Sequence, residues 1–186
     1  TDFFIPQEAT PENFVLSVGR LDPTKGYDFL IGSLSLIPEK IRPELFIVCD
    51  SMDQNFEKHL KAAALKKNIT LRIYPNISDE ALRVLYGSSA LVLCAAHHEP
   101  FGLVPLEAMA CGVPVIAVNE GGFAETVVDQ KTGYLLDRNA TLWARSIEAL
   151  LLDRPARLRL GNEGRQEATR LWGRDLFRKR LEQSLV

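Results

Sequence analysis

Two cationic side chains follow the first apolar run of the sequence. Arg20 and Lys25 lie in the segment SVGRLDPTKG, residues 17–26. A guanidinium binds phosphate in bidentate fashion and an ammonium binds it as a point charge, so the pair could neutralise a diphosphate. The same spacing is also compatible with two solvated charges on a loop. The segment matches neither the P-loop pattern nor the glycine-rich dinucleotide fingerprint.

Two carboxylates lie eight residues apart further along the chain. Glu99 and Glu107 belong to the segment HHEPFGLVPLEAMACG, in which we expect Glu99 on a loop and Glu107 on a helix. A carboxylate in such a place can accept hydrogen bonds from ribose hydroxyls. The amides at the helix start can bind phosphate, although Pro105 offers none, and Gly102 permits close ligand approach. The alternative is a solvated Glu99 and a Glu107 that forms a local cap or salt bridge.

A third loop, residues 119–125 (NEGGFAE), contains paired glycines. Gly121 and Gly122 would let the backbone approach a ligand, or would only form a flexible turn into a helix. The neighbouring histidines His97 and His98 point apart on an extended loop and are a poor pair of metal ligands. We therefore expect no metal site.

Composition excludes several classes of protein. The 186 residues are 46% hydrophobic and 25% charged, with 22 Lys and Arg against 24 Asp and Glu. This is the composition of one globular domain, without the basic excess of a nucleic-acid binder. We expect no transmembrane segment and no signal peptide. Cys49, Cys94 and Cys111 lie in apolar runs, which indicates buried thiols in a reducing compartment and a cytoplasmic location.

The elements that must position these residues alternate along the chain. Strands are predicted over 14–18, 45–49, 69–74, 90–95, 114–118 and 133–136. Helices are predicted over 27–37, 56–67, from 79 onwards after the N-cap Ser78, over 105–111, and two or three times between 141 and 186. The alternation predicts an α/β fold, a Rossmann-like doubly wound parallel sheet of about six strands. Ligands of such sheets bind at the carboxyl ends of the strands, where all three loops begin.

Together the three loops resemble the C-terminal, donor-binding half of the GT-B retaining glycosyltransferases of family 4, or group 1. The G-R-x-x-x-x-K-G motif matches residues 19–26, and the E-x7-E signature matches Glu99 and Glu107 within EPFGLVPLEAMACGVPVIA. A Gly-Gly-x-x-Glu element matches residues 121–125, and a further segment matches 74–82. The resemblance covers residues 2 to about 172.

The resemblance implies roles for individual residues. Arg20 and Lys25 would bind the donor's diphosphate and stabilise the leaving nucleotide, Glu99 would hold the transferred sugar, and Glu107 would accept from the ribose. Arg20, Lys25 and Glu99 are thus the implied catalytic residues. Further substrate contacts are implied at Phe101, Gly102, Leu103 and Val104, and at Asn76 and Ile77, where the base would lie against backbone. No cofactor is implied, because the nucleotide sugar is the substrate, and UDP, GDP and ADP donors are not distinguished.

The resemblance also implies a division of the chain. Residues 1–12 would be an interdomain linker remnant, residues 13–171 the nucleotide-sugar-binding domain, and residues 172–186 a C-terminal helix. That helix would cross back to an N-terminal domain that binds the acceptor and is absent here. The start of the chain could instead be that of a processed or tagged whole protein.

The function expected from the resemblance is retaining, metal-independent transfer of a sugar from a nucleotide diphosphate donor to a hydroxyl acceptor. The full-length protein would be a hexosyltransferase, and the fragment alone would be inactive. Two alternatives remain open: a non-catalytic nucleotide-binding module of a regulatory protein, and a glycogen-synthase-type transferase. A nucleotide-sugar epimerase matches the E-x7-E segment less well. Peripheral attachment to the inner membrane through the absent domain also remains open.

Overall fold

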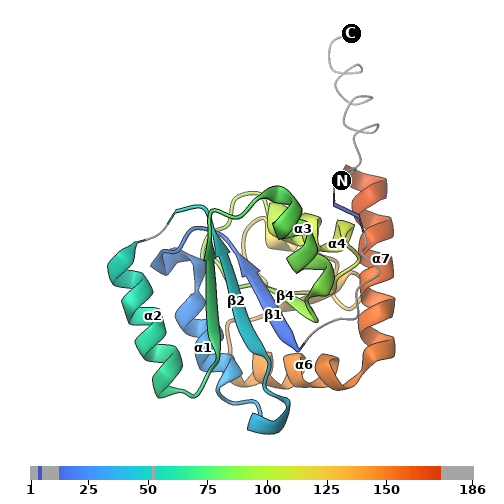
Figure 1. Ribbon diagram of the computed structural model, residues 1–186. Coiled ribbons are helices and arrows are strands. Elements are labelled where there is room, and N and C mark those ends of the chain that lie inside the picture. The colour runs from blue at the N-terminus through green and yellow to red at the C-terminus, as the bar shows by residue number, and fades with distance from the viewer. Residues whose placement is uncertain (1–3, 6–12, 52, 173–186) are drawn as a thin grey trace.

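Six parallel strands form one sheet in the computed structural model, which describes residues 4–5, 13–51 and 53–172 (Figure 1). The strand order is β3-β2-β1-β4-β5-β6, that of a doubly wound sheet. The strands are β1 (Phe14–Val18), β2 (Glu44–Cys49), β3 (Leu71–Pro75), β4 (Leu91–Cys94), β5 (Val115–Val118) and β6 (Gly133–Leu136). The predicted Rossmann-like fold is confirmed.

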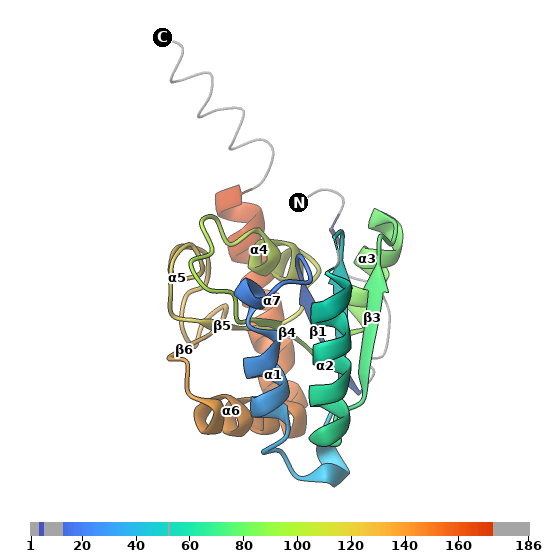
Figure 2. The ribbon, with the colours of Figure 1, turned by 90° about the vertical axis from the view of Figure 1, so that its left-hand side faces the viewer.

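Helices cover both faces of the sheet. The helices are α1 (Tyr27–Leu34), α2 (Gln54–Lys66), α3 (Asp79–Ser88), α4 (Leu103–Ala110), α5 (Phe123–Thr126), α6 (Ala140–Leu152) and α7 (Arg154–Trp172), with short 3-10 turns at Pro23–Lys25 and Glu39–Ile41. Helices α1 and α2 pack side by side on one face, and α3, α4 and α7 lie on the other (Figures 1 and 2). Every residue of β4 and β5 is buried between these layers, as their wholly apolar sequences require.

Helix ends follow local chemistry. Ser78 is the N-cap of α3, as predicted, and its hydroxyl accepts a hydrogen bond from the Ala81 amide at 3.2 Å. The helix predicted over 27–37 ends at Leu34, and Pro38 disfavours a helical conformation at the preceding Ile37. The helix predicted over 105–111 begins earlier, at Leu103, because Gly102 takes the left-handed N-cap conformation with φ 67°.

Some predictions fall largely outside the described residues. Of the expected linker 1–12, Phe4 and Ile5 are described, and the Phe4 ring packs edge-on against Tyr86 with centroids 5.7 Å apart. Of the expected C-terminal helix 172–186, the described part stops at Trp172. The three cysteines are buried and free.

Candidate functional site

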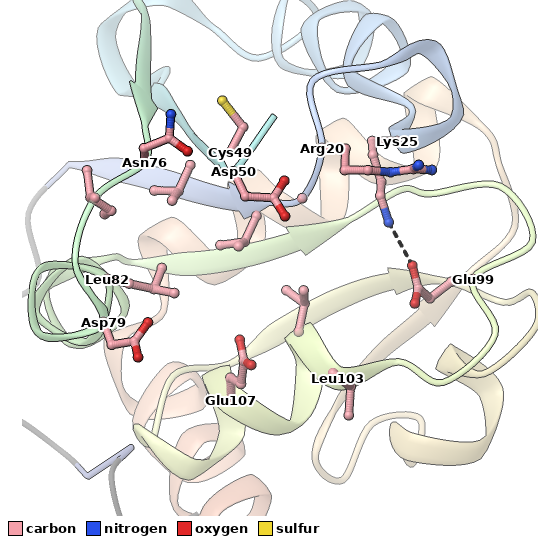
Figure 3. Close-up of a pocket in the computed structure, with 15 residues that line it drawn as sticks. Arg20, Lys25, Cys49, Asp50, Asn76, Asp79, Leu82, Glu99, Leu103 and Glu107 are labelled. Atoms are coloured by element: carbon pink, nitrogen blue, oxygen red, sulfur yellow. Dashed lines mark hydrogen bonds and ion pairs between the residues drawn. The ribbon is translucent and has the colours of Figure 1, made fainter. Parts of the chain in front are cut away.

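A cleft opens at the carboxyl ends of the strands. It has a cavity volume of about 580 Å³, and it is lined from the ends of β1 and β2, the segment after β3, the loop after β4, and the helices α3 and α4 (Figure 3). Strands β1 and β4 are neighbours in the sheet, with Val15 opposite Leu91, although two strands separate them in sequence. The cleft therefore lies at the switch in strand order, where the sequence predicts it.

The loop after β1 is pressed tightly against the loop after β4. Gly26 has φ 72°, and a Cβ added there would lie 2.1 Å from the carbonyl oxygen of Ala95. The amide of His97 donates to the Thr24 carbonyl at 2.7 Å. The Tyr27 hydroxyl donates to the Gly19 carbonyl at 3.0 Å and fixes the other end of the loop. These contacts direct Lys25 into the cleft.

Lys25 and Glu99 form an ion pair inside the cleft. The Lys25 Nζ lies 2.9 Å from Glu99 Oε2, and the two side chains are only 21% and 18% exposed (Figure 3). Arg20 lies differently, because its side chain is 62% exposed and its Nε pairs with Asp22 Oδ2 at 3.2 Å. The structure thus brings together all three residues expected to be catalytic, with Lys25 inside the cleft and Arg20 at its exposed margin.

The paired glycines support the Glu99 loop. The amide of Gly122 donates to the Glu99 carbonyl at 2.7 Å, and a Cβ on Gly121 would lie 2.5 Å from the same oxygen. A Cβ on Gly122 would lie 2.7 Å from the carbonyl carbon of Phe101. The two glycines do not line the cleft but let the loops after β4 and β5 pack backbone to backbone.

Glu107 points into the cleft from α4 (Figure 3). The hydroxyl of Tyr86 donates to Glu107 Oε2 at 2.8 Å. Burial raises the pKa of Glu107, and the hydrogen bond from Tyr86 opposes that rise. The alternative of a local cap or salt bridge for Glu107 is wrong, since the partner that the structure gives it is Tyr86, 21 residues away.

Four of the six further contact residues line the cleft. These are Asn76, Ile77, Leu103 and Val104. Phe101 and Gly102 are not among the lining residues: the Phe101 side chain is 72% exposed, and a Cβ on Gly102 would lie 2.8 Å from the Gly122 carbonyl oxygen. Gly102 packs against the neighbouring loop, and a direct substrate contact by these two residues stays a prediction.

Several residues that line the cleft or support its loops were not predicted from the sequence. Arg138, after β6, donates through Nη1 to the Ala95 carbonyl at 2.7 Å and pairs through Nη2 with Glu120 Oε2 at 3.0 Å, so it ties three loops together. Long-range bonds to carbonyl groups leave no pattern in sequence. Asp50 and Asp79 also line the cleft. Asp50 was predictable in principle, since it directly follows a strand that ends at the same edge of the sheet.

Two further features of the described residues concern metals and membranes. No group of three His, Cys, Asp or Glu side chains within residues 4–5, 13–51 and 53–172 is arranged to hold a metal ion. Within the same ranges, no helix is both long enough and apolar enough to cross a membrane.

Solved structures share this architecture. The C-terminal domain of a glycosyl transferase group 1 family protein, LpcC, from Francisella tularensis matches 92% of this chain and 96% of that domain, with a TM-score of 0.79 and 24% identity. The structure of HepE from Anabaena in complex with UDP and glucose matches 93% of this chain and 48% of HepE, with a TM-score of 0.84 and 25% identity.

Sequence relatives agree with the structures. The D-inositol 3-phosphate glycosyltransferase of Salinispora arenicola is 34% identical over 164 residues, which make up 83% of this chain and 37% of that enzyme. The chain thus spans well under half the length of this relative. The family model described as glycosyl transferases group 1 matches residues 1–167. The chain therefore belongs to the glycosyl transferases group 1 family.

Proposed function

We propose that this chain is the donor-binding domain of a retaining, metal-independent glycosyltransferase, which transfers a hexose from a nucleotide diphosphate sugar to a hydroxyl acceptor. The observation that carries the proposal is the cleft itself. It is lined by a mostly buried cation, Lys25, which pairs with Glu99, and by a second carboxylate, Glu107, at the switch in strand order. A nucleotide sugar needs a cation at the diphosphate and acceptors for hydroxyl groups at both ends.

The diphosphate would lie between the loop after β1 and the start of α4. Lys25 and Arg20 supply positive charge there, and the amides of the first turn of α4 would donate to the phosphate from Leu103 and Val104, which line the cleft. When the bond between the sugar C1 and the diphosphate oxygen breaks, its electron pair passes to that oxygen. Fixed cations stabilise this developing charge without a metal ion.

Retention would require the acceptor oxygen to bond to C1 on the face that the diphosphate leaves. The acceptor's proton would then pass to the departing diphosphate oxygen, so that charge and atoms balance. Glu99 would accept hydrogen bonds from hydroxyls of the transferred sugar. Glu107 would do the same for the ribose, with the base against the backbone at Asn76 and Ile77.

The acceptor would bind to a part of the protein outside this chain. The chain covers 37% of the inositol phosphate glycosyltransferase and 48% of HepE, so more than half of each relative has no counterpart here. The UDP in the HepE structure supports a nucleotide donor for this family member. We infer a cytoplasmic enzyme, in line with three free, buried thiols.

Calorimetric titration with UDP, GDP and ADP tests the proposal. One of these should bind with a dissociation constant of roughly 10 µM to 1 mM, because only part of the site is present. Glu107→Ala should abolish that binding, whereas Glu148→Ala on α6, away from the cleft, should preserve it. Absence of binding both here and in the full-length protein would refute a donor site and leave a binding module for another ligand. Binding without transfer in the full-length protein would favour a regulatory module.

A further inference from the structure

Tyr86 contacts Glu107 from the protein interior, behind the wall of the cleft. The tyrosine lies on α3, is fully buried and is not among the residues that line the cleft, whereas Glu107 is. The two are joined by the 2.8 Å hydrogen bond from the Tyr86 hydroxyl to Glu107 Oε2. Tyr86 therefore contacts the carboxylate without occupying the space that a ligand would take.

Both partners of this bond are held in place. The Phe4 ring packs edge-on against the Tyr86 ring, at an interplanar angle of 86°, and the ring is otherwise enclosed in the core. Glu107 belongs to α4, which packs on α7 and on β4 and β5. A donor enclosed in the core and an acceptor on a packed helix make a bond whose direction is set before any ligand binds.

The hydrogen bond from Tyr86 favours the ionised carboxylate of Glu107, and the guanidinium groups of Arg83 on α3 and Arg165 on α7 lie near the neighbouring thiol of Cys111. Burial raises the pKa of Glu107, and the nearby carboxylate of Asp79 on α3 raises it further. The thiols of Cys94 on β4 and Cys111 at the C-cap of α4 also lie near this pair, but burial raises the pKa of both, to about 12 for Cys111. These thiols are therefore neutral at physiological pH.

We propose that Tyr86 is a positioning residue for nucleotide recognition, which holds the Glu107 carboxylate ionised and turned toward the ribose hydroxyls. The proposal rests on the donor site argued above. A carboxylate oxygen has two lone pairs, so Oε2 can accept from Tyr86 and still accept from a hydroxyl of the ligand. The hydrogen bond sets the plane of the carboxylate, and a vicinal diol can then donate to both of its oxygens.

The test compares Tyr86→Phe with the unaltered protein, using the nucleoside diphosphate that binds best and its 2′-deoxy analogue. Tyr86→Phe keeps the ring and removes only the hydroxyl, and it should weaken binding of the ribonucleotide about tenfold. Tyr134→Phe on β6, a strand at the far edge of the sheet, is the matched control and should bind as the unaltered protein does. The preference for the ribonucleotide over its 2′-deoxy analogue should shrink in Tyr86→Phe alone.

The pH dependence supplies a second readout. Without the Tyr86 hydroxyl the pKa of Glu107 should rise, so the loss of affinity on acidification should begin at higher pH than in the unaltered protein. Protonation of the nucleotide's own phosphate is common to both proteins and cancels in their ratio. The ribose preference within one variant is likewise independent of the fraction of protein that is folded.

The outcomes separate this inference from the proposed function. An unchanged ribose preference and an unchanged pH profile in Tyr86→Phe, with nucleotide binding intact, would overturn the inference and leave the donor site standing. A double variant with Glu107→Gln extends the test: Tyr86→Phe should then add little further loss, whereas additive losses would show that Tyr86 acts independently. Failure of the unaltered protein to bind any nucleotide would overturn both.

Discussion

The Lys25 ammonium lies 2.9 Å from the Glu99 carboxylate, inside the cleft and largely out of solvent. The cation that we assign to the diphosphate thus already has an anionic partner in the unliganded site. That partner orients Lys25, and it also competes with any phosphate that approaches. Glu99 would therefore act in two opposite ways, by weakening the binding of the bare nucleotide and by binding the sugar.

Glu99→Gln should separate these two effects. The substitution keeps the size of the side chain but removes its charge, so Lys25 becomes fully available and the repulsion of a diphosphate disappears. We expect a nucleoside diphosphate to bind several-fold more tightly to the variant, by calorimetry. Transfer from the nucleotide sugar, measured in the full-length protein, should fall by two orders of magnitude or more.

Glu125→Gln is the matched control for this prediction. Glu125 is an exposed carboxylate on α5 and does not line the cleft, so its substitution should change neither quantity. Weaker binding of the bare nucleotide to Glu99→Gln would contradict the idea of competition. It would indicate that the main effect of Glu99 is to orient Lys25.

The two cations should contribute unequally to turnover. Lys25→Ala removes a mostly buried charge and leaves Glu99 unpaired, whereas Arg20 is mostly exposed and its charge is screened by solvent. We expect both Lys25→Ala and Arg20→Ala to lower kcat/KM in the full-length protein by orders of magnitude, with the larger loss for Lys25→Ala. Near-normal turnover in both variants would remove the basis for the diphosphate assignment.

Gly26 should be irreplaceable for a steric reason. A Cβ at this position would lie 2.1 Å from a backbone oxygen of Ala95, and φ is 72°, so neither atom can move without separating the loops after β1 and β4. Gly26→Ala should cost about 2 kcal/mol or more in the free energy of unfolding and lower Tm by about 4 °C or more, by thermal denaturation.

Gly32 offers the opposite case in the same region of the chain. It lies within α1, and a Cβ there would meet nothing within 4 Å. Gly32→Ala should stabilise the protein by about 0.5–1 kcal/mol, because alanine loses less conformational entropy in a helix. Equal effects of the two substitutions would contradict the contact between Gly26 and Ala95.

The sequence was sufficient to predict which loops meet but not how their side chains pair. Apolar runs such as 14–18 and 91–94 identify buried parallel strands, and the rule for doubly wound sheets places their following loops at one edge. Lys25 and Glu99 are 74 residues apart, and their contact depends on the adjacency of β1 and β4. No periodicity encodes that adjacency, since it arises from the global strand order.

Contacts to backbone atoms could not be predicted from the sequence for a different reason. Arg138 binds the carbonyl groups of Ala95 and Ala96, and any residue there would offer the same oxygen atoms. The paired glycines at 121 and 122 were interpreted as facing a ligand or forming a flexible turn. They instead accommodate the backbone of residues 99–101. A glycine in the sequence indicates that another group approaches the backbone closely, but it does not indicate whether that group is a ligand or a neighbouring loop.

Glu107 should reduce stability in the unliganded protein. Burial raises the pKa of this carboxyl group in the folded state, so its ionisation is easier in the unfolded chain. The resulting penalty is absent below the unfolded pKa, grows as pH rises from the unfolded to the folded pKa, and is constant above it. Glu107→Gln should therefore raise Tm at about pH 8. The gain should vanish toward about pH 4 and below, where the Glu107 carboxyl of the unaltered protein becomes protonated in both the folded and the unfolded state.

The gain at about pH 8 follows from the direction of the shift, since a raised pKa in the folded state makes ionisation of Glu107 unfavourable to folding. The same variant should bind nucleotide more weakly, so stability and affinity would move in opposite directions, as at sites built for a ligand. Thermal unfolding of Glu107→Gln and of the control Glu148→Gln across this pH range measures the effect. A Tm that falls at high pH would mean that the Tyr86 bond more than offsets the penalty of burial. Glu107 would then be a stabilising residue of the core rather than a carboxylate kept ionised for a ligand.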